Sequence, residues 1–148
     1  MKHVIISVDV EPDWFDIEKG GLSSLRGLNF LQDAAIKHGM PLTYLVTYEC
    51  AVREEAVKAI RNFMDSGMCE VGHHLHVWST PPLDNPNPYG VDTQWIHAVQ
   101  SELSDAVFDN KMKTLHDAIK VNYGTAPRSH RAGRWGQPER PIDGLIPG

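Results

Sequence analysis

The sequence has no excess of basic charge and no long apolar run. Its 14 Lys and Arg residues are outnumbered by 19 Asp and Glu residues, which gives a formal net charge of -5. Such a chain offers no positive field to a phosphate backbone, so we expect no nucleic acid partner. No segment approaches the roughly 20 apolar residues of a membrane span, and the N-terminus lacks the pattern of a signal peptide. We therefore expect a cytoplasmic protein.

The motifs of several common enzyme classes are also missing. No GxGxxG follows the first apolar run and no GxxxxGK[ST] occurs, which argues against a Rossmann domain and a P-loop. The GxSxG motif of serine hydrolases is absent too. The two cysteines, Cys50 and Cys69, form no CxxC pair, and we expect both to be reduced core residues. A length of 148 residues fits one domain spanning 1–148.

Hydrophobic periodicity predicts alternating strands and helices. We expect strands over residues 3–10, 42–48 and 69–77 and a fourth starting near Arg128, with helices over 23–38, 53–66 and 104–123. This alternation is typical of a parallel sheet with helices outside it, an α/β fold. Four prolines within residues 79–88 predict a surface loop, and we expect little regular structure in the tail after Trp135.

Two carboxylates follow the first predicted strand. Asp9 and Glu11 are two residues apart, so in an extended chain their side chains point the same way. Ligands of parallel α/β folds bind at the carboxyl ends of strands, where this pair lies. Taken alone, the pair is also compatible with a solvated loop or a helix cap, which short acidic motifs more often form.

Histidine is the unusual entry in the composition, with three of the eight histidines inside four positions. In the predicted third strand, His74 and His76 share one face while His73 points to the other. Burying several imidazoles is costly unless something binds them. Two imidazoles with a carboxylate form a set that suits zinc, although nickel, cobalt and iron remain alternatives. We therefore interpret His74 and His76 as metal ligands.

A third polar segment, SHRAGRWG, spans residues 129–136. Arg131 is expected at the end of the fourth strand, where its guanidinium can hold a carboxylate in a bidentate pair. Trp135 can form the floor of a sugar site, or be a core residue instead. We expect Arg134 and His130 to be surface or packing residues.

Together, the segments SVDVEPDW (7–14), EVGHHLHVWSTPP (70–82) and SHRAGRWG (129–136) resemble the first three motifs of the polysaccharide deacetylase family, the NodB-homology carbohydrate esterases. The resemblance covers nearly the whole chain. It implies a partial (β/α) barrel with about four parallel strands and outer helices. It also implies a hydrolase that removes N-acetyl or O-acetyl groups from a polysaccharide or oligosaccharide, using a divalent metal ion, preferably Zn²⁺.

The same resemblance implies roles for individual residues. Asp9 would be the catalytic base and Arg131 the residue that orients it, while the metal ligands would be Glu11, His74 and His76. The two histidines follow a subgroup pattern, His-x-His, in place of the commoner His-x-x-x-His. The commoner spacing places Trp78 at the second histidine, and we expect Trp78 and Trp135 to contact substrate.

The chain departs from the family after its third motif. No later acid-aromatic motif follows, nor does the leucine-histidine motif whose histidine is the family's general acid, so we interpret the chain as the N-terminal part of such a domain. Missing strands would leave an open sheet edge, which predicts self-association. Two other hypotheses remain: a metal-dependent amidohydrolase acting on a small non-glycan amide, and a non-catalytic remnant that binds metal or carbohydrate.

Overall fold

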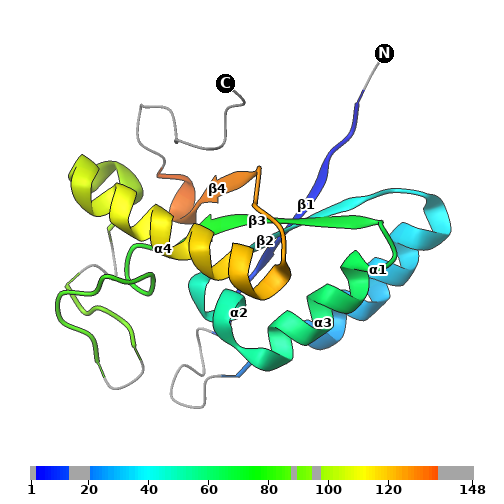
Figure 1. Ribbon diagram of the computed structural model, residues 1–148, viewed down its shortest axis with the longest axis horizontal. Coiled ribbons are helices and arrows are strands. Elements are labelled where there is room, and N and C mark those ends of the chain that lie inside the picture. Colours follow the sequence, from blue (N-terminus) through cyan, green and yellow to red (C-terminus); the bar gives the residue numbers. More distant parts are fainter. Residues whose placement is uncertain (1–2, 14–20, 88–89, 95–97, 137–148) are drawn as a thin grey trace.

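Four parallel strands form a single curled sheet in a computed structural model that describes residues 3–13, 21–87, 90–94 and 98–136. The strands follow one another in chain order across the sheet: β1 (Ile6–Val10), β2 (Leu42–Val46), β3 (Cys69–Leu75) and β4 (His130–Ala132). Figure 1 shows the helices in an arc along one side of this sheet. The architecture is that of an α/β half-barrel, as the alternating pattern predicts.

Among the described residues, four α-helices connect the strands, and two of them end at a glycine. They are α1 (Leu25–His38), α2 (Tyr48–Val52), α3 (Glu54–Met64) and α4 (Asp105–Tyr123), with short 3-10 turns η2 (Gln100–Glu102) and η3 (Gly133–Trp135). Gly39 and Gly124 end α1 and α4 with φ of 62° and 75°. This left-handed conformation is cheap only for glycine, so both helices stop there.

The core fills the space between the sheet and the helices. Tyr44 of β2 and Ile60 of α3 are fully buried there, as is Leu115 of α4. Buried hydroxyls are hydrogen-bonded: Tyr44 donates to Gln32 at 2.9 Å, and Tyr123 of α4 donates to the carbonyl of Cys50 at 2.8 Å. The hydrogen bond between Tyr123 and Cys50 connects α4 to α2 on the helical side of the sheet.

The observed elements are shorter than predicted at several ends. The first strand begins at Ile6, because the sheet pairs β1 with β2 only from Ile6 onward, and Val4 and Ile5 are more than 80% exposed. The second strand stops at Val46, and the short helix α2 follows, which was not predicted because five residues carry little helical periodicity. The third strand ends at Leu75, so His76 lies just beyond it.

The proline-rich segment is a loop over its described residues 79–87, as predicted. It is attached to α4 by buried Lys111, which donates to the carbonyls of Thr80 at 2.6 Å and Pro82 at 2.5 Å. Cys50 and Cys69 are both free thiols, the first buried and the second half-buried. The predicted irregular tail, residues 137–148, lies outside the described residues. Among the described helices, none is long and apolar enough to cross a membrane.

Candidate metal centre

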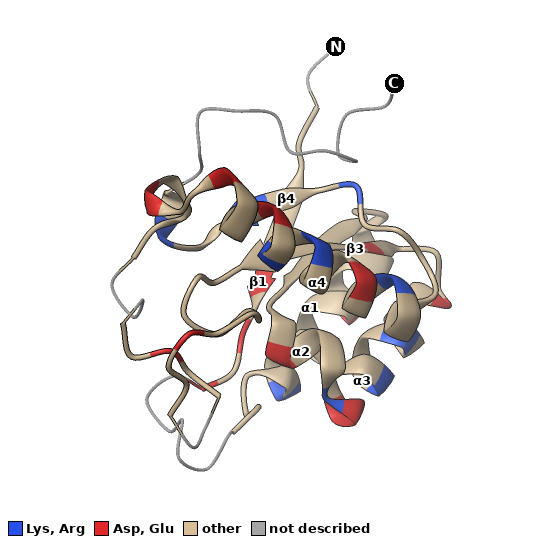
Figure 2. Ribbon diagram, turned by 60° about the vertical axis from the view of Figure 1, so that its left-hand side comes forward, with Lys and Arg blue, Asp and Glu red and all other residues tan. Residues whose placement is uncertain are grey.

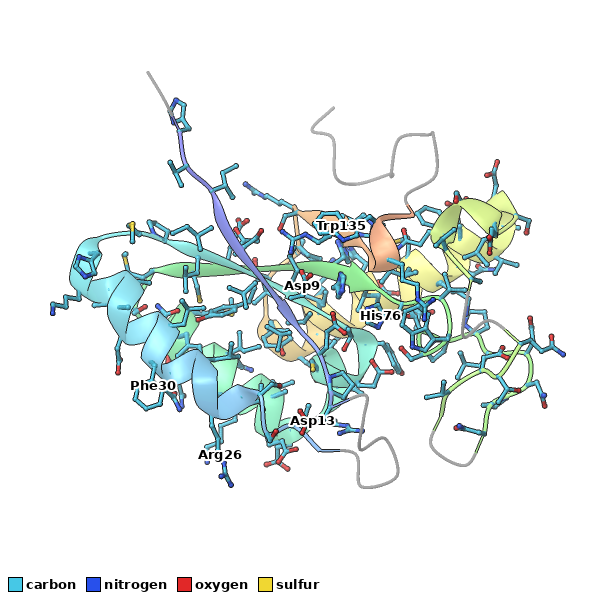
Figure 3. The ribbon with its side chains drawn as sticks, turned by 180° about the vertical axis from the view of Figure 1, so that it is seen from behind. Asp9, Asp13, Arg26, Phe30, His76 and Trp135 are labelled. Carbon is cyan, nitrogen blue, oxygen red and sulfur yellow. The ribbon has the colours of Figure 1, made fainter. Side chains whose placement is uncertain are left out.

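A cavity of about 420 Å³ opens where the carboxyl ends of the strands meet. In Figure 3, Asp9, His76 and Trp135 come from three separate segments and lie around this region, whereas Arg26 and Phe30 lie out on α1. The residues that line the cavity are Asp9, Glu11, His74, His76, Trp78, Val91, Arg131, Ala132, Arg134 and Trp135. All three polar segments of the sequence therefore contribute to one site.

Glu11, His74 and His76 place one ligand atom each within 4.8 Å of the others. The Nε2 of His74 is 3.0 Å from Oε1 of Glu11, and the Nε2 of His76 is 3.6 Å from Oε2. The two Nε2 atoms are 3.0 Å apart. Zinc bonds of about 2.0–2.1 Å in a tetrahedron separate ligand atoms by roughly 3.3 Å, so these spacings suit a tetrahedral ion.

The hydrogen bonds of His74 define which of its nitrogens can bind a cation. Its Nδ1 lies 2.9 Å from the carbonyl oxygen of Arg131. Because a carbonyl oxygen can only accept a hydrogen bond, we assign the N–H of the ring to Nδ1. In the neutral ring, the Nε2 lone pair then faces the Glu11 carboxylate. Two acceptors at this distance are stable only with a proton or a cation between them. A backbone carbonyl that fixes the tautomer in this way is a common partner of metal-ligating histidine.

Electrostatics distinguish the two imidazoles in the metal-free site. Burial, and to a smaller extent the neighbouring His74, lower the pKa of His76 to about 3. Burial also acts to lower the pKa of His74, but the hydrogen bond with Glu11 and the charge of Asp9 outweigh it, and that pKa is raised. His76 is thus neutral at pH 7, which is the form that a metal ion requires.

Arg131 of β4 reaches across the sheet edge to two residues of β1. Its Nη1 donates to Oδ1 of Asp9 at 2.5 Å, and its Nη2 donates to the hydroxyl of Ser7. The expected bidentate pair is therefore wrong in detail: the two guanidinium donors are divided between a carboxylate and a serine, because Ser7 and Asp9 are on the same face of β1. The other oxygen of Asp9, Oδ2, is 3.9 Å from Nε2 of His74.

Two tryptophans contact charged groups at the cavity wall. Trp78 is buried, and its indole stacks on the ring of His76 with centroids 4.3 Å apart. The guanidinium of Arg134 lies over Trp78 at 4.7 Å from the ring centroid. Trp135 is 80% exposed, and the guanidinium of Arg131 lies 5.2 Å from its centroid. Cation–π contacts of this kind hold the arginines in place.

Glycine permits the close contact between His76 and the third segment. A Cβ on Gly133 would lie 2.6 Å from Cδ2 of His76 and 2.8 Å from the carbonyl oxygen of Leu75. Real Cβ atoms do not approach other atoms so closely. Position 133 must therefore be glycine for His76 to keep its place in the triad.

The structure brings together all seven residues singled out in the sequence for catalysis, metal binding or substrate contact. Two further residues were missed. Ser7 could have been found from the alternation of Ser7, Asp9 and Glu11 along one strand face. Arg134 was expected at the surface or in packing; it is exposed, as expected, and it also lines the cavity, which was not predicted. Its orientation depends on a left-handed backbone at φ 56°, which the sequence does not signal. His130 is a packing residue, since its Nε2 lies 3.2 Å from Oε1 of Gln100.

Comparisons of the chain with protein-family models, with curated proteins and with solved structures found no match. The geometry of the site and the motif resemblance therefore carry the functional argument.

Proposed function

We propose that this chain is a metal-dependent hydrolase of the polysaccharide deacetylase type, which removes acetyl groups from an N-acetylated or O-acetylated saccharide. One observation carries the proposal: a carboxylate and two imidazoles converge within 4.8 Å, and an Asp–Arg pair lies beside them. A cavity of about 420 Å³ is in the range of small-molecule sites and accommodates the end of a saccharide chain.

Glu11, His74 and His76 would hold the metal ion, and zinc fits this donor set best. A divalent ion, when bound here, would supply an activated water near neutral pH and would polarise the acyl carbonyl. Asp9 would act as the base that takes a proton from the attacking water. Arg131 fixes the Asp9 carboxylate through Oδ1, so Oδ2 stays directed toward the triad.

The departing amine or hydroxyl must gain a proton as the acyl bond breaks. Among the described cavity residues, every ionisable side chain other than Asp9 belongs to the proposed metal ligands or is an arginine. Within this described set, the proton that Asp9 has accepted is the one that could pass to the leaving group. A reaction without a separate general acid is about 10²- to 10⁴-fold slower than one with it.

The test is acetate release from N-acetylglucosamine oligomers and from O-acetylated oligosaccharides, measured with zinc, with a chelator and with Asp9→Asn. We expect release that needs zinc and falls about 10²- to 10⁴-fold in Asp9→Asn, because the base is lost while the ligands remain. Elemental analysis should find the same metal content in the variant. Asp33→Asn, which makes the same change on the exposed face of α1, is the control and should leave release unchanged.

Other outcomes would replace the proposal. Hydrolysis of simple N-acetyl amides without any of the saccharides would identify a metal-dependent amidohydrolase of small molecules. Metal binding without hydrolysis of any substrate would identify a non-catalytic binding protein. Release that survives both chelation and Asp9→Asn would mean that the site described above is not the catalytic site.

A further inference from the structure

Among the charged residues described in the cavity lining, Arg134 is the one to which the proposed chemistry gives no role. It is the central residue of η3, and both it and Trp135 adopt left-handed backbone conformations, with φ of 56° and 59°. Residues other than glycine rarely adopt this conformation, because it is sterically unfavourable for a residue with a side chain. Such strain is concentrated at binding and catalytic sites, where the surrounding structure imposes a side-chain direction.

The strained turn directs the Arg134 guanidinium into the cavity wall beside His76. The guanidinium lies over the indole of Trp78, which itself stacks on the His76 ring. A guanidinium lying on an aromatic face keeps its N–H donors at its edges, where they remain available to a ligand. Within the described ranges, Arg134 forms no ion pair with a carboxylate of the protein, unlike Arg131, which is paired with Asp9.

The charges around the cavity favour an anionic ligand once a metal is present. The carboxylates of Asp9 and Glu11 are balanced by the guanidiniums of Arg131 and Arg134. A divalent ion bound to neutral histidines would therefore give the cavity a net positive charge, equal to the charge of the ion. The chain as a whole has a formal net charge of -5. Figure 2 shows an acidic position on β1 and both signs of charge scattered along the helices. The cavity thus differs in charge from the chain as a whole.

We propose that Arg134 is a substrate-binding residue that pairs with a carboxylate, so that the substrate class is an N-acylated sugar carrying an acidic group. The inference rests on the proposed hydrolase function and specifies its substrate. Arginine is suited to this role because its planar donors match a carboxylate in two parallel hydrogen bonds. Trp78 provides the platform that fixes the plane of those donors.

The experiment compares neutral N-acetylglucosamine with two acidic relatives. One is oxidised to a carboxylate at C6, and the other carries a lactyl ether at C3. Binding to the zinc-loaded protein is measured by calorimetry, and acetate release is measured on the same three sugars. We expect at least one acidic sugar to bind about tenfold or more tightly than the neutral one, because charge-assisted pairs are the stronger hydrogen bonds.

Arg134→Gln should abolish that preference, so that the acidic and neutral sugars bind with similar affinity, and Arg134→Lys should restore part of it. Arg26→Gln removes the same charge from the exposed face of α1 and should keep the preference. Equal affinity for all three sugars would overturn the inference. So would a preference that persists in Arg134→Gln, since the carboxylate would then bind the metal or another group.

The two proposals fail in distinguishable ways. Hydrolysis of all three sugars with equal kcat/KM would leave the hydrolase standing and overturn the role of Arg134. Arg134-dependent binding of an acidic sugar without hydrolysis of any sugar would support the carboxylate site and remove the hydrolase function.

Discussion

Gly133 is the residue on which the contact between the second and third polar segments depends. Its missing side chain lets the backbone of residues 132–134 lie against the His76 ring and the Leu75 carbonyl. The same backbone carries Arg131 and Arg134 into the cavity on either side. A single glycine thus positions a metal ligand, the arginine that holds the base and the proposed carboxylate-binding group.

Gly133→Ala should weaken zinc binding, because the added Cβ would be 2.6 Å from the His76 ring and 2.8 Å from a backbone oxygen that cannot move freely. We expect the affinity for zinc to fall at least about tenfold, in the range found when groups that orient metal ligands are removed. Competition with a chromophoric chelator measures this affinity.

Gly27→Ala is the matched control. Nothing lies within 4 Å of a Cβ at this position in α1, so the alanine should leave zinc affinity unchanged and stabilise the helix by about 0.5–1 kcal/mol. Equal zinc affinity in Gly133→Ala and wild type would show that the close contact does not hold His76.

At the level of elements, the connection between α4 and the proline-rich loop is a buried lysine. Lys111 is 1% exposed, and burial lowers its pKa, while the charges of Asp92 and Asp84 act against that shift. Its ammonium satisfies two loop carbonyls, those of Thr80 and Pro82. The loop leads from Trp78 to Val91, both of which line the cavity, so this helix position supports the cavity wall.

Lys111→Met should destabilise the protein by about 1–3 kcal/mol, because the buried carbonyl of Thr80 and the part-buried carbonyl of Pro82 lose their donor while the apolar stem is kept. Lys113→Met, on the same helix, is the control: that lysine is 74% exposed and pairs with Asp117, so its removal should cost less than about 1 kcal/mol. Urea denaturation measures both. Equal unfolding free energies for the two variants would contradict the anchoring role of Lys111.

The elements that the sequence predicts well are those with long periodic patterns. The helix predicted over 104–123 is observed over Asp105–Tyr123, and the helix predicted over 23–38 ends at His38 as predicted. The one-turn helix α2 was not predicted, because its signal is too short. Lys111 falls at helical spacing among apolar residues, but its buried partners come from a loop with no periodicity.

The site residues, like the elements, were predicted where a local sequence pattern determines their position and missed where tertiary contacts determine it. Asp9, Glu11 and His74 were placed correctly because strand alternation and the rule of strand ends apply to them. The exposed position of Arg134 was predicted, but its part in the cavity was not, because its direction comes from a left-handed backbone that only tertiary contacts stabilise. The guanidinium of Arg131 donates to both Asp9 and Ser7 because of how β1 and β4 lie relative to each other across the sheet. No local sequence pattern encodes that arrangement.

At the scale of the whole molecule, histidines are buried on both sides of β3. His73 points away from the metal centre, and its Nδ1 donates to the carbonyl of Ser129 at 3.1 Å while its ring stacks on His116 at 5.3 Å. Burial lowers the pKa of His73 to about 4 and that of His130 to about 3, from an ordinary value of 6.5. The folded protein therefore resists protonation that the unfolded chain accepts.

The metal-free protein should lose stability as pH falls below about 6.5. Above that pH both states are neutral at these histidines, whereas below it only the unfolded chain gains protons. Each of the two lowers the free energy of unfolding by up to about 1.4 kcal/mol per pH unit until its folded pKa is reached. Denaturation between pH 7 and 4.5 in a chelating buffer measures the slope.

His130→Gln should make that dependence less steep, and His38→Gln, at the exposed end of α1, should leave it unchanged. If the stability of His130→Gln changed with pH as steeply as that of the wild type, the lowered pKa of His130 would not be a source of the pH dependence.

Both edges of the sheet are unpaired within the described residues, because β1 and β4 each pair on one side only. Self-association through these edges stays a prediction.

The central claim is that Glu11, His74 and His76 hold one metal ion, and metal content tests it most directly. Elemental mass spectrometry of the purified protein after zinc loading and desalting should find about one ion per chain. The double variant His74→Ala with His76→Ala should hold none, and the control His3→Ala with His38→Ala, at exposed positions, should retain it. A folded wild type without metal, or a double variant that keeps it, would contradict the account.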